Sequence, residues 1–221
     1  MKYFTPEYLN FFKELAANNN RDWFAANRKR YEQYVKEPLH KFIGDLIAEL
    51  AKEDKRIQIT PSEAIFRINR DIRFAKDKSP YKLYSSAAVN AGGKKDTQNA
   101  GLYMELGPEK LAFAGGMYQP EKDTLMMIRD AIAAKPAKFQ AALADKSFKK
   151  YWGDVLGERN KVLPAEYKKV AEQVPHIYNK QFYYWTELDP QIIVSDKLMK
   201  TALDHYAASK SMRDFLEGAL K

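Results

Sequence analysis

Hydrophobic residues recur at helical spacing along the first part of the chain. The pattern predicts three helices, which begin at Pro6, near Asp22 and at Leu39. Pro6 fits the first turn of a helix, where a missing amide hydrogen is tolerated. The three asparagines at positions 18–20 are expected to end the first helix because asparagine favours caps and turns. Pro38 is expected to interrupt the second helix.

The middle of the chain alternates between hydrophobic and polar residues, which is the period of a strand. Short strands are predicted over residues 56–60, 65–74, 83–90, 102–106 and 110–113. Turns containing glycine or proline separate several of them. Short strands divided by such turns predict an antiparallel meander.

Helical spacing returns after Pro120. Helices are predicted over residues 125–132, 139–143, 148–156 and 164–174, and from Ser195 onwards. Aromatic and β-branched residues at 182–188 and 191–194 predict one or two further strands. The order of these elements predicts an α+β fold with N-terminal helices, a central, mostly antiparallel sheet and C-terminal helices. The 221 residues are expected to form a single domain, 1–221.

Composition excludes several kinds of chemistry. The chain contains no cysteine, so disulfides, thiol catalysis and cysteine-ligated metals are excluded. Residues 1–10 lack the apolar segment of a secretory signal, and no apolar run is long enough to span a bilayer. These features predict a cytoplasmic protein without a membrane partner. The formal net charge of +8 favours anionic partners in general.

Half of that net charge comes from one short segment, FRINRDIRFAKDKSPYK, at residues 66–82, which we call the basic block. It holds six positive and two negative residues and therefore contributes +4 of the net +8. The positive residues are Arg67, Arg70, Arg73, Lys76, Lys78 and Lys82, and the negative ones are Asp71 and Asp77. The positive charge of the chain is thus local.

Side chains alternate between two faces if residues 66–74 form a strand. One face is apolar, with Phe66, Ile68, Ile72 and Phe74, and Arg70 interrupts it. The other face carries only polar side chains, which are Arg67, Asn69, Asp71 and Arg73. Arginine forks bind phosphate or carboxylate through paired hydrogen bonds. The polar face is therefore expected to recognise an anion.

Arg70 stands apart because it lies on the apolar face. An unpaired charge in a buried position is unfavourable, so Arg70 is expected to have a partner. The candidates are Glu63, Glu105 or a bound ligand. The lysines that follow are expected on a turn, where Tyr81 and Tyr84 either stack on a ligand or cover the loop.

Several blocks of the chain resemble one family of uncharacterised bacterial and fungal proteins, the domain of unknown function 2461 family. The basic block is similar to the family pattern Arg-x-x-Arg-Asp-x-Arg-Phe-x-x-Asp-Lys-x-Pro-Tyr-Lys. Residues 9–39 resemble its opening helices, and residues 101–132 and 178–188 resemble later segments. The family commonly has serine where this chain has Ala75. The resemblance implies a single α+β domain and a cytoplasmic location, and it carries no established activity.

The resemblance also brings a second basic position into the candidate site. The family signature Asn-Asn-x-Arg-x-Trp-Phe falls on residues 18–24, which places its arginine at Arg21. Two distant basic signatures that recur together are expected to meet in space. Arg21 is therefore a candidate for a second cationic wall, and Lys180 is a weaker candidate.

No residue pattern indicates a metal, a cofactor or a particular reaction. His40, His176 and His205 lack metal-ligand spacing, and the glycine pairs fit neither nucleotide-binding fingerprint. Catalytic residues are not assigned. Nearby arginines are expected to lower the pKa values of Asp71 and Asp77 and to keep both ionised, so each is either an ion-pair partner or a group that positions a metal or nucleophile.

The sequence predicts a protein that binds an anionic, phosphate- or carboxylate-bearing ligand through residues 67–82. The candidate residues are Arg67, Arg70, Asp71, Arg73, Asp77, Lys78, Tyr81, Lys82 and Arg21. The partner is a small molecule or nucleic acid, and a compact pocket is favoured because no nucleic-acid-binding fold signature is present. Two alternatives remain. One is an enzyme that acts on a phosphorylated substrate or nucleic acid, and the other is a purely structural network of ion pairs.

Overall fold

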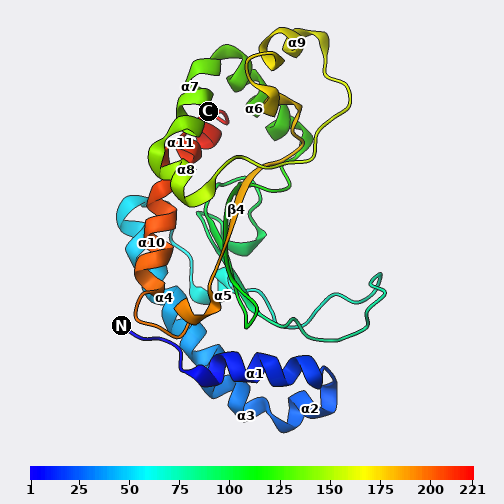
Figure 1. Cartoon of the computed structure of the whole chain (residues 1–221), viewed down its shortest axis with the longest axis vertical. Coiled ribbons are helices and arrows are strands. Elements are labelled where there is room, and N and C mark those ends of the chain that lie inside the picture. Colours follow the sequence, from blue (N-terminus) through cyan, green and yellow to red (C-terminus); the bar gives the residue numbers. More distant parts are fainter. The chain divides into compact units, whose positions relative to one another are not determined.

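Helices precede and follow a four-stranded antiparallel sheet in the computed structural model, which describes residues Met1–Lys221 (Figure 1). The strands pair in the order β1-β2-β3-β4. Their bounds are β1 (Ser85–Val89), β2 (Leu102–Leu106), β3 (Leu111–Met117) and β4 (Phe182–Leu188). This arrangement confirms the predicted α+β class with an antiparallel sheet, and the strands predicted over residues 83–90, 102–106 and 110–113 are its consecutive neighbours β1, β2 and β3.

The chain divides into two compact units. Unit 1 comprises Met1–Lys94, Tyr103–Phe113 and Glu187–Leu203, and unit 2 comprises Lys95–Leu102, Ala114–Thr186 and Asp204–Lys221. The single domain expected over residues 1–221 stays a prediction. No helix in either unit is long and apolar enough to cross a membrane.

Unit 1 contains the N-terminal helices. They are α1 (Pro6–Ala17), α2 (Arg21–Ala26), α3 (Arg28–Tyr31), the π-helical turn η1 (Glu32–Lys36), α4 (Glu37–Glu53) and the short α5 (Pro61–Ala64). Pro38 lies in the first turn of α4, and the helical path continues into it through η1. Proline removes one backbone donor, and the wider π-helical turn accommodates that loss. Pro38 therefore changes the helix geometry and does not end the helix.

Aromatic side chains form the core around α1. Phe4, Tyr8 and Phe12 are fully buried and pack as neighbouring rings. The Tyr8 hydroxyl donates to the Leu106 carbonyl at 3.0 Å and so fixes α1 against β2. Burial of such rings supplies much of the stabilisation of a small core.

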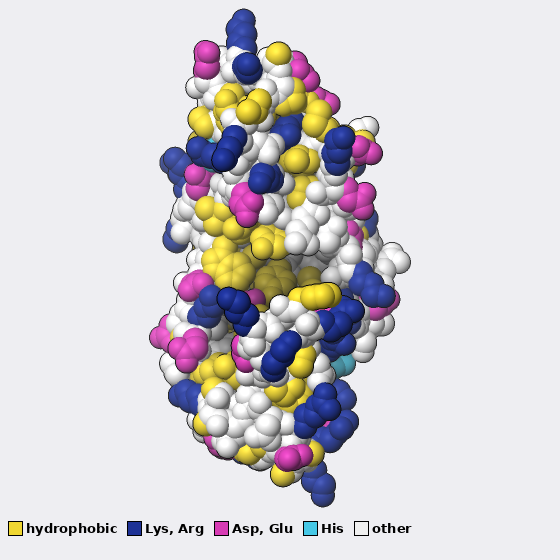
Figure 2. All heavy atoms as spheres, turned by 90° about the vertical axis from the view of Figure 1, so that its right-hand side faces the viewer, with side chains coloured by type: hydrophobic (Ala, Val, Ile, Leu, Met, Phe, Trp, Pro, Cys, Tyr) yellow, Lys and Arg dark blue, Asp and Glu magenta, His cyan; other side chains and the backbone are white.

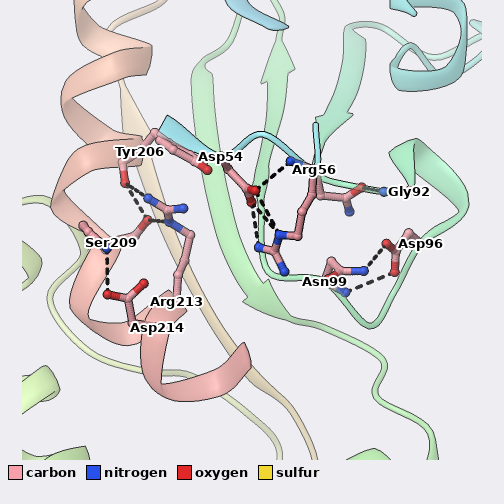
Figure 3. A network of polar contacts seen from close by, with 11 residues as sticks. Asp54, Arg56, Gly92, Asp96, Asn99, Tyr206, Ser209, Arg213 and Asp214 are labelled. Carbon is pink, nitrogen blue, oxygen red and sulfur yellow. Dashed lines mark hydrogen bonds and ion pairs between the residues drawn. The ribbon is translucent and has the colours of Figure 1, made fainter. Parts of the chain in front are cut away.

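Two predicted strands of unit 1 are absent. Residues 55–56 form a turn after α4, where the Arg56 guanidinium bonds back to the Asp54 carboxylate, and residues 57–60 are irregular (Figure 3). Residues 65–74 form only isolated antiparallel bridges, Ile65 with Ala87 and Asn69 with Tyr81. The basic block thus makes an irregular arm that projects away from β1 (Figure 1).

The predicted apolar face is present up to Ile72 and fails at Phe74. The side chains on this face up to Ile72 are half-buried, and those on the opposite face are exposed, which are Arg67, Asn69, Asp71 and Arg73. Phe74 is 95% exposed, with the Arg73 guanidinium 6.0 Å from its ring centroid. A strand is stabilised by a partner ladder and a covered face, and residues 71–79 have neither. The alternation in the sequence therefore matches the alternation in burial up to Ile72, although the pairing there consists of isolated bridges and not of a continuous ladder.

Unit 2 contains most of the later helices. They are α6 (Lys122–Ala134), α7 (Pro136–Ala144), α8 (Lys146–Trp152), α9 (Ala165–Ala171) and α11 (Lys210–Gly218), while α10 (Leu198–Ala208) begins in unit 1. Three short 3₁₀ turns complete the chain, η2 (Gly93–Lys95), η3 (Pro175–Tyr178) and η4 (Pro190–Ile192). The last of these stands where a strand was predicted over residues 191–194. Proline at its start and the Asp189 cap favour a turn there.

Unit 2 holds two buried arginines, Arg129 and Arg213, that donate to backbone and hydroxyl oxygens. Arg129 donates to the carbonyls of Ile177 and Asn179, each at 3.0 Å. Arg213 donates to the Ser209 hydroxyl and the Tyr206 carbonyl (Figure 3). Both side chains act as structural braces, because backbone and hydroxyl oxygens satisfy their donors.

Candidate functional site

The base of the basic block is fixed by an asparagine from the turn between α1 and α2. The Asn19 amide donates to the Tyr81 carbonyl at 2.9 Å and accepts from the Tyr81 amide at 3.1 Å. The Tyr81 ring stacks on Phe24 of α2, with centroids 4.1 Å apart. The two segments singled out by the family resemblance therefore meet in space through Asn19, Phe24 and Tyr81.

Arg70 finds its partner within the same block. Its guanidinium forms an ion pair with Asp77 and donates to the Ser79 carbonyl at 3.2 Å. The loop supports this pair, because the Asp77 carboxylate also accepts from the Ser79 amide and hydroxyl at 2.9 and 2.6 Å. These bonds from Ser79 and then Arg70 hold the pKa of Asp77 far below its ordinary value.

Neither carboxylate expected to pair with Arg70 does so. Glu63 closes the capping box of α5 with Thr60. Glu105 accepts from the Tyr103 hydroxyl at 2.8 Å. The Arg70 side chain points toward its own loop, where it meets Asp77. The prediction assumed a straight strand over residues 66–74 and therefore did not bring Asp77 back to Arg70.

Other charges of the block are also paired locally. The Arg73 guanidinium forms an ion pair with Asp71 at 2.7 Å, and both side chains are well exposed. The hydrogen bonds from Arg73 lower the pKa of Asp71 to about 2. Lys78 donates to the Ile72 carbonyl at 3.0 Å. An exposed pair of this kind adds little stability, because water and salt screen it.

A pocket of about 450 Å³ opens at the base of the basic block. Its lining residues all belong to unit 1, and they are Ala16, Asn19, Arg70, Asp71, Asp77, Ser79, Tyr81, Lys82, Leu83 and Tyr84. The pocket thus collects two cations and two carboxylates on one surface.

The predicted site residues divide into two groups. Arg70, Asp71, Asp77, Tyr81 and Lys82 line the pocket. The others, Arg67, Arg73, Lys78 and Arg21, are exposed and lie outside its lining. Arg21 begins α2, and the residues of its signature that contact the basic block are Asn19 and Phe24. Tyr81 is buried and already stacked, so its ring covers the loop.

Lys82 occupies the most unusual position in this pocket. It is half-buried, and its ammonium lies 5.3 Å from the Phe66 ring centroid and 5.9 Å from that of Tyr84. Its one polar side-chain contact is the Ser86 hydroxyl at 3.5 Å, and no carboxylate lies within ion-pair distance. Burial lowers the pKa of Lys82, and Arg67 adds to this effect while Glu105 opposes it.

Two tyrosines lie beside the neighbours of Lys82: Tyr84, whose ring is near the ammonium, and Tyr103, whose ring is 6.0 Å from that of Phe66. Burial and the neighbouring Glu105 raise the pKa of Tyr84, which keeps its hydroxyl neutral. Tyr103 is held by its bond to Glu105. The pattern of charges did not single out Ser86 or Tyr103, because both lie on sheet strands outside the basic block. The antiparallel pairing of Ile65 with Ala87 brings this part of β1 beside the block.

The fold and the pocket together define an α+β protein with a mixed-charge pocket beside an irregular basic arm. No group of three or more His, Asp or Glu side chains is placed to hold a metal ion. The model of the family described as "Conserved hypothetical protein (DUF2461)" matches residues 7–215, and the chain belongs to this family. No curated protein and no solved structure matches the chain.

Proposed function

We propose that the pocket binds a small anionic ligand, bearing phosphate or carboxylate, with Lys82 and Arg70 as its cations. The observation that carries this proposal is the Lys82 ammonium. It is half-buried in a pocket and has no carboxylate partner in the chain. A cation removed from water is stabilised by an opposite charge, and an incoming anion would supply one.

Arg70 is suited to a share in that binding. Its two hydrogen bonds, to Asp77 and to Ser79, both use Nη1. The other donors of the guanidinium fork have no partner in the chain. A guanidinium presents several donors in a fixed plane, which favours phosphate and carboxylate oxygens. Arg70 can therefore keep its loop contacts while it contacts a ligand.

The size of the pocket favours a small molecule. Its volume of about 450 Å³ falls within the range of roughly 300–1,000 Å³ that is usual for small-molecule sites. Figure 2 shows the face from which the basic block projects, and positive, negative and hydrophobic side chains are interspersed over it. A nucleic-acid groove would require a continuous cationic track. A compact ligand is therefore favoured over a polymer.

The proposal is tested by phosphate binding to the full chain, measured by isothermal titration calorimetry. We expect Lys82→Met to bind inorganic phosphate roughly tenfold to a hundredfold more weakly, because one charge-assisted contact is lost. The matched control is Lys76→Met, which removes the same charge from an exposed position outside the pocket. The control should bind as the unaltered chain does. Equal weakening in both variants, or no phosphate binding at all, would contradict the proposal.

A structural role for the basic block is the second candidate, and the pairs Arg70–Asp77 and Arg73–Asp71 favour it. If these pairs serve only to shape the loop, Arg70→Ala and Arg70→Met should change the melting temperature and leave phosphate affinity unchanged. Methionine keeps much of the apolar stem and should destabilise less than alanine. Our proposal instead expects both variants to lose phosphate affinity. Calorimetry and thermal melts on the same samples separate the two candidates.

A further inference from the structure

The amine of Lys82 differs chemically from the other lysines of the basic block. Lys78 is exposed and tied to a backbone carbonyl, and Lys76 is exposed. Lys82 is half-buried, lies near the Phe66 and Tyr84 rings and faces a pocket large enough for a small molecule. Desolvation without a carboxylate partner is an environment that makes a lysine nucleophilic.

We propose that Lys82 is a nucleophilic amine that forms a Schiff base with a small carbonyl compound carrying an anionic group. The anionic part of this ligand rests on the proposed function, since Arg70 lines the same pocket and has free donors for it. The nucleophilic part rests on Lys82 alone.

The reaction needs no further reagent. The lone pair of the neutral amine attacks the carbonyl carbon, and the carbonyl π electrons move to oxygen, which takes up a proton. The nitrogen of the resulting carbinolamine loses its proton and forms the C=N bond, while the protonated hydroxyl leaves as water. One amine and one carbonyl compound thus give one imine and one water.

The surroundings of Lys82 favour the neutral amine that this step requires. Burial lowers the pKa of Lys82 and is the main cause of the shift. The charge of Glu105 on β2 raises this pKa by more than the charge of Arg67 lowers it, so burial determines the direction. Tyr84 stays neutral because its own pKa is raised. Arg70, Asp71 and Asp77 complete the charged groups that line the pocket.

Reductive trapping tests this inference. The full chain is incubated separately with pyruvate, glycolaldehyde phosphate or uncharged butanal in the presence of sodium cyanoborohydride, which reduces an imine to a stable secondary amine. Peptide mass spectrometry then gives the rate of modification at each lysine. We expect Lys82 to be modified severalfold faster than Lys76 and Lys78 with all three probes, and fastest with the two anionic ones. Modification of Lys82 no faster than of Lys76 and Lys78 by any probe would overturn the inference.

Lys82→Arg tests the nucleophile directly. Arginine lacks the nucleophilic amine, so we expect the fast adduct to disappear and the slow modification of Lys76 and Lys78 to stay as in the unaltered chain. Phosphate binding and modification of the unaltered chain then separate this inference from the proposed function. Preferential modification by butanal in a chain that binds no phosphate would support the nucleophile and overturn the anionic ligand. Phosphate binding without preferential modification would overturn the nucleophile and leave the proposed function standing.

Discussion

Lys82 and Arg70 show at the scale of single residues what charge patterns reveal and what they miss. The sequence singled out Arg70 because it interrupts an apolar face, and it predicted that a partner was needed. The partner is Asp77, seven positions further along the same loop. Lys82 was one cation among six, yet it is the one whose ammonium is half-buried in the pocket without a carboxylate. The burial of Lys82 depends on which strand lies beside this residue, and the charge pattern carries no information about that neighbour.

The lowered pKa of Lys82 predicts how stability depends on pH. In the window between the folded-state pKa and the ordinary value of 10.5, the unfolded chain binds more protons than the folded one. Stability therefore rises with pH through that window as far as Lys82 is concerned. We expect the free energy of unfolding of the unaltered chain, relative to Lys82→Met, to increase between about pH 7 and about pH 10.

Urea unfolding at the two pH values measures this difference, and other titrating groups cancel in the comparison. Lys76→Met serves as the control, since its amine is exposed. A difference between the unaltered chain and Lys82→Met that stays constant with pH would show that Lys82 has an ordinary pKa.

At the scale of elements, periodicity predicted helices and sheet strands well and failed on the basic block. The helices of both ends and the strands around residues 85–117 and 182–188 have continuous patterns and packed partners. Residues 65–74 have the same alternation, but their backbone bonds to residues 80–87 form two isolated bridges and no continuous ladder. The side-chain amide of Asn19 takes the place of a partner strand at Tyr81, because it forms hydrogen bonds with both backbone groups of that residue.

Asn19→Ala should therefore weaken the attachment of the basic block to the α1–α2 turn. Two hydrogen bonds to partly buried backbone groups are lost, and we expect a decrease in the free energy of unfolding of about 1–3 kcal/mol. The matched control is Asn18→Ala, because the Asn18 amide makes one exposed bond to the nearby Glu14 carbonyl. Urea unfolding of both variants provides the comparison. If Asn18→Ala were as destabilising as Asn19→Ala, the long-range contact would have no special role.

At the scale of the whole molecule, the sequence located the excess positive charge in the basic block, but it did not predict which residues line the pocket. The order of helices and strands was sufficient for the α+β class, and the family match extends over residues 7–215. The pocket draws on residues separated by more than sixty positions, such as Ala16 and Lys82. Only the resemblance predicted that the two segments meet. It led to Arg21 as the candidate, whereas the residues of that signature at the contact are Asn19 and Phe24.

The most direct test of the central claim is a titration of the full chain with inorganic phosphate, in which nuclear magnetic resonance follows the signals of individual residues. The side-chain signal of Lys82 should shift on titration, and its pKa should rise, because a bound anion stabilises the ammonium. Backbone signals of Asn19 and Tyr84 should move with the same midpoint, while those near Arg129 and Arg213 in unit 2 should not. Shifts spread evenly over exposed lysines, with an unchanged Lys82 pKa, would contradict a phosphate- or carboxylate-binding pocket at Lys82.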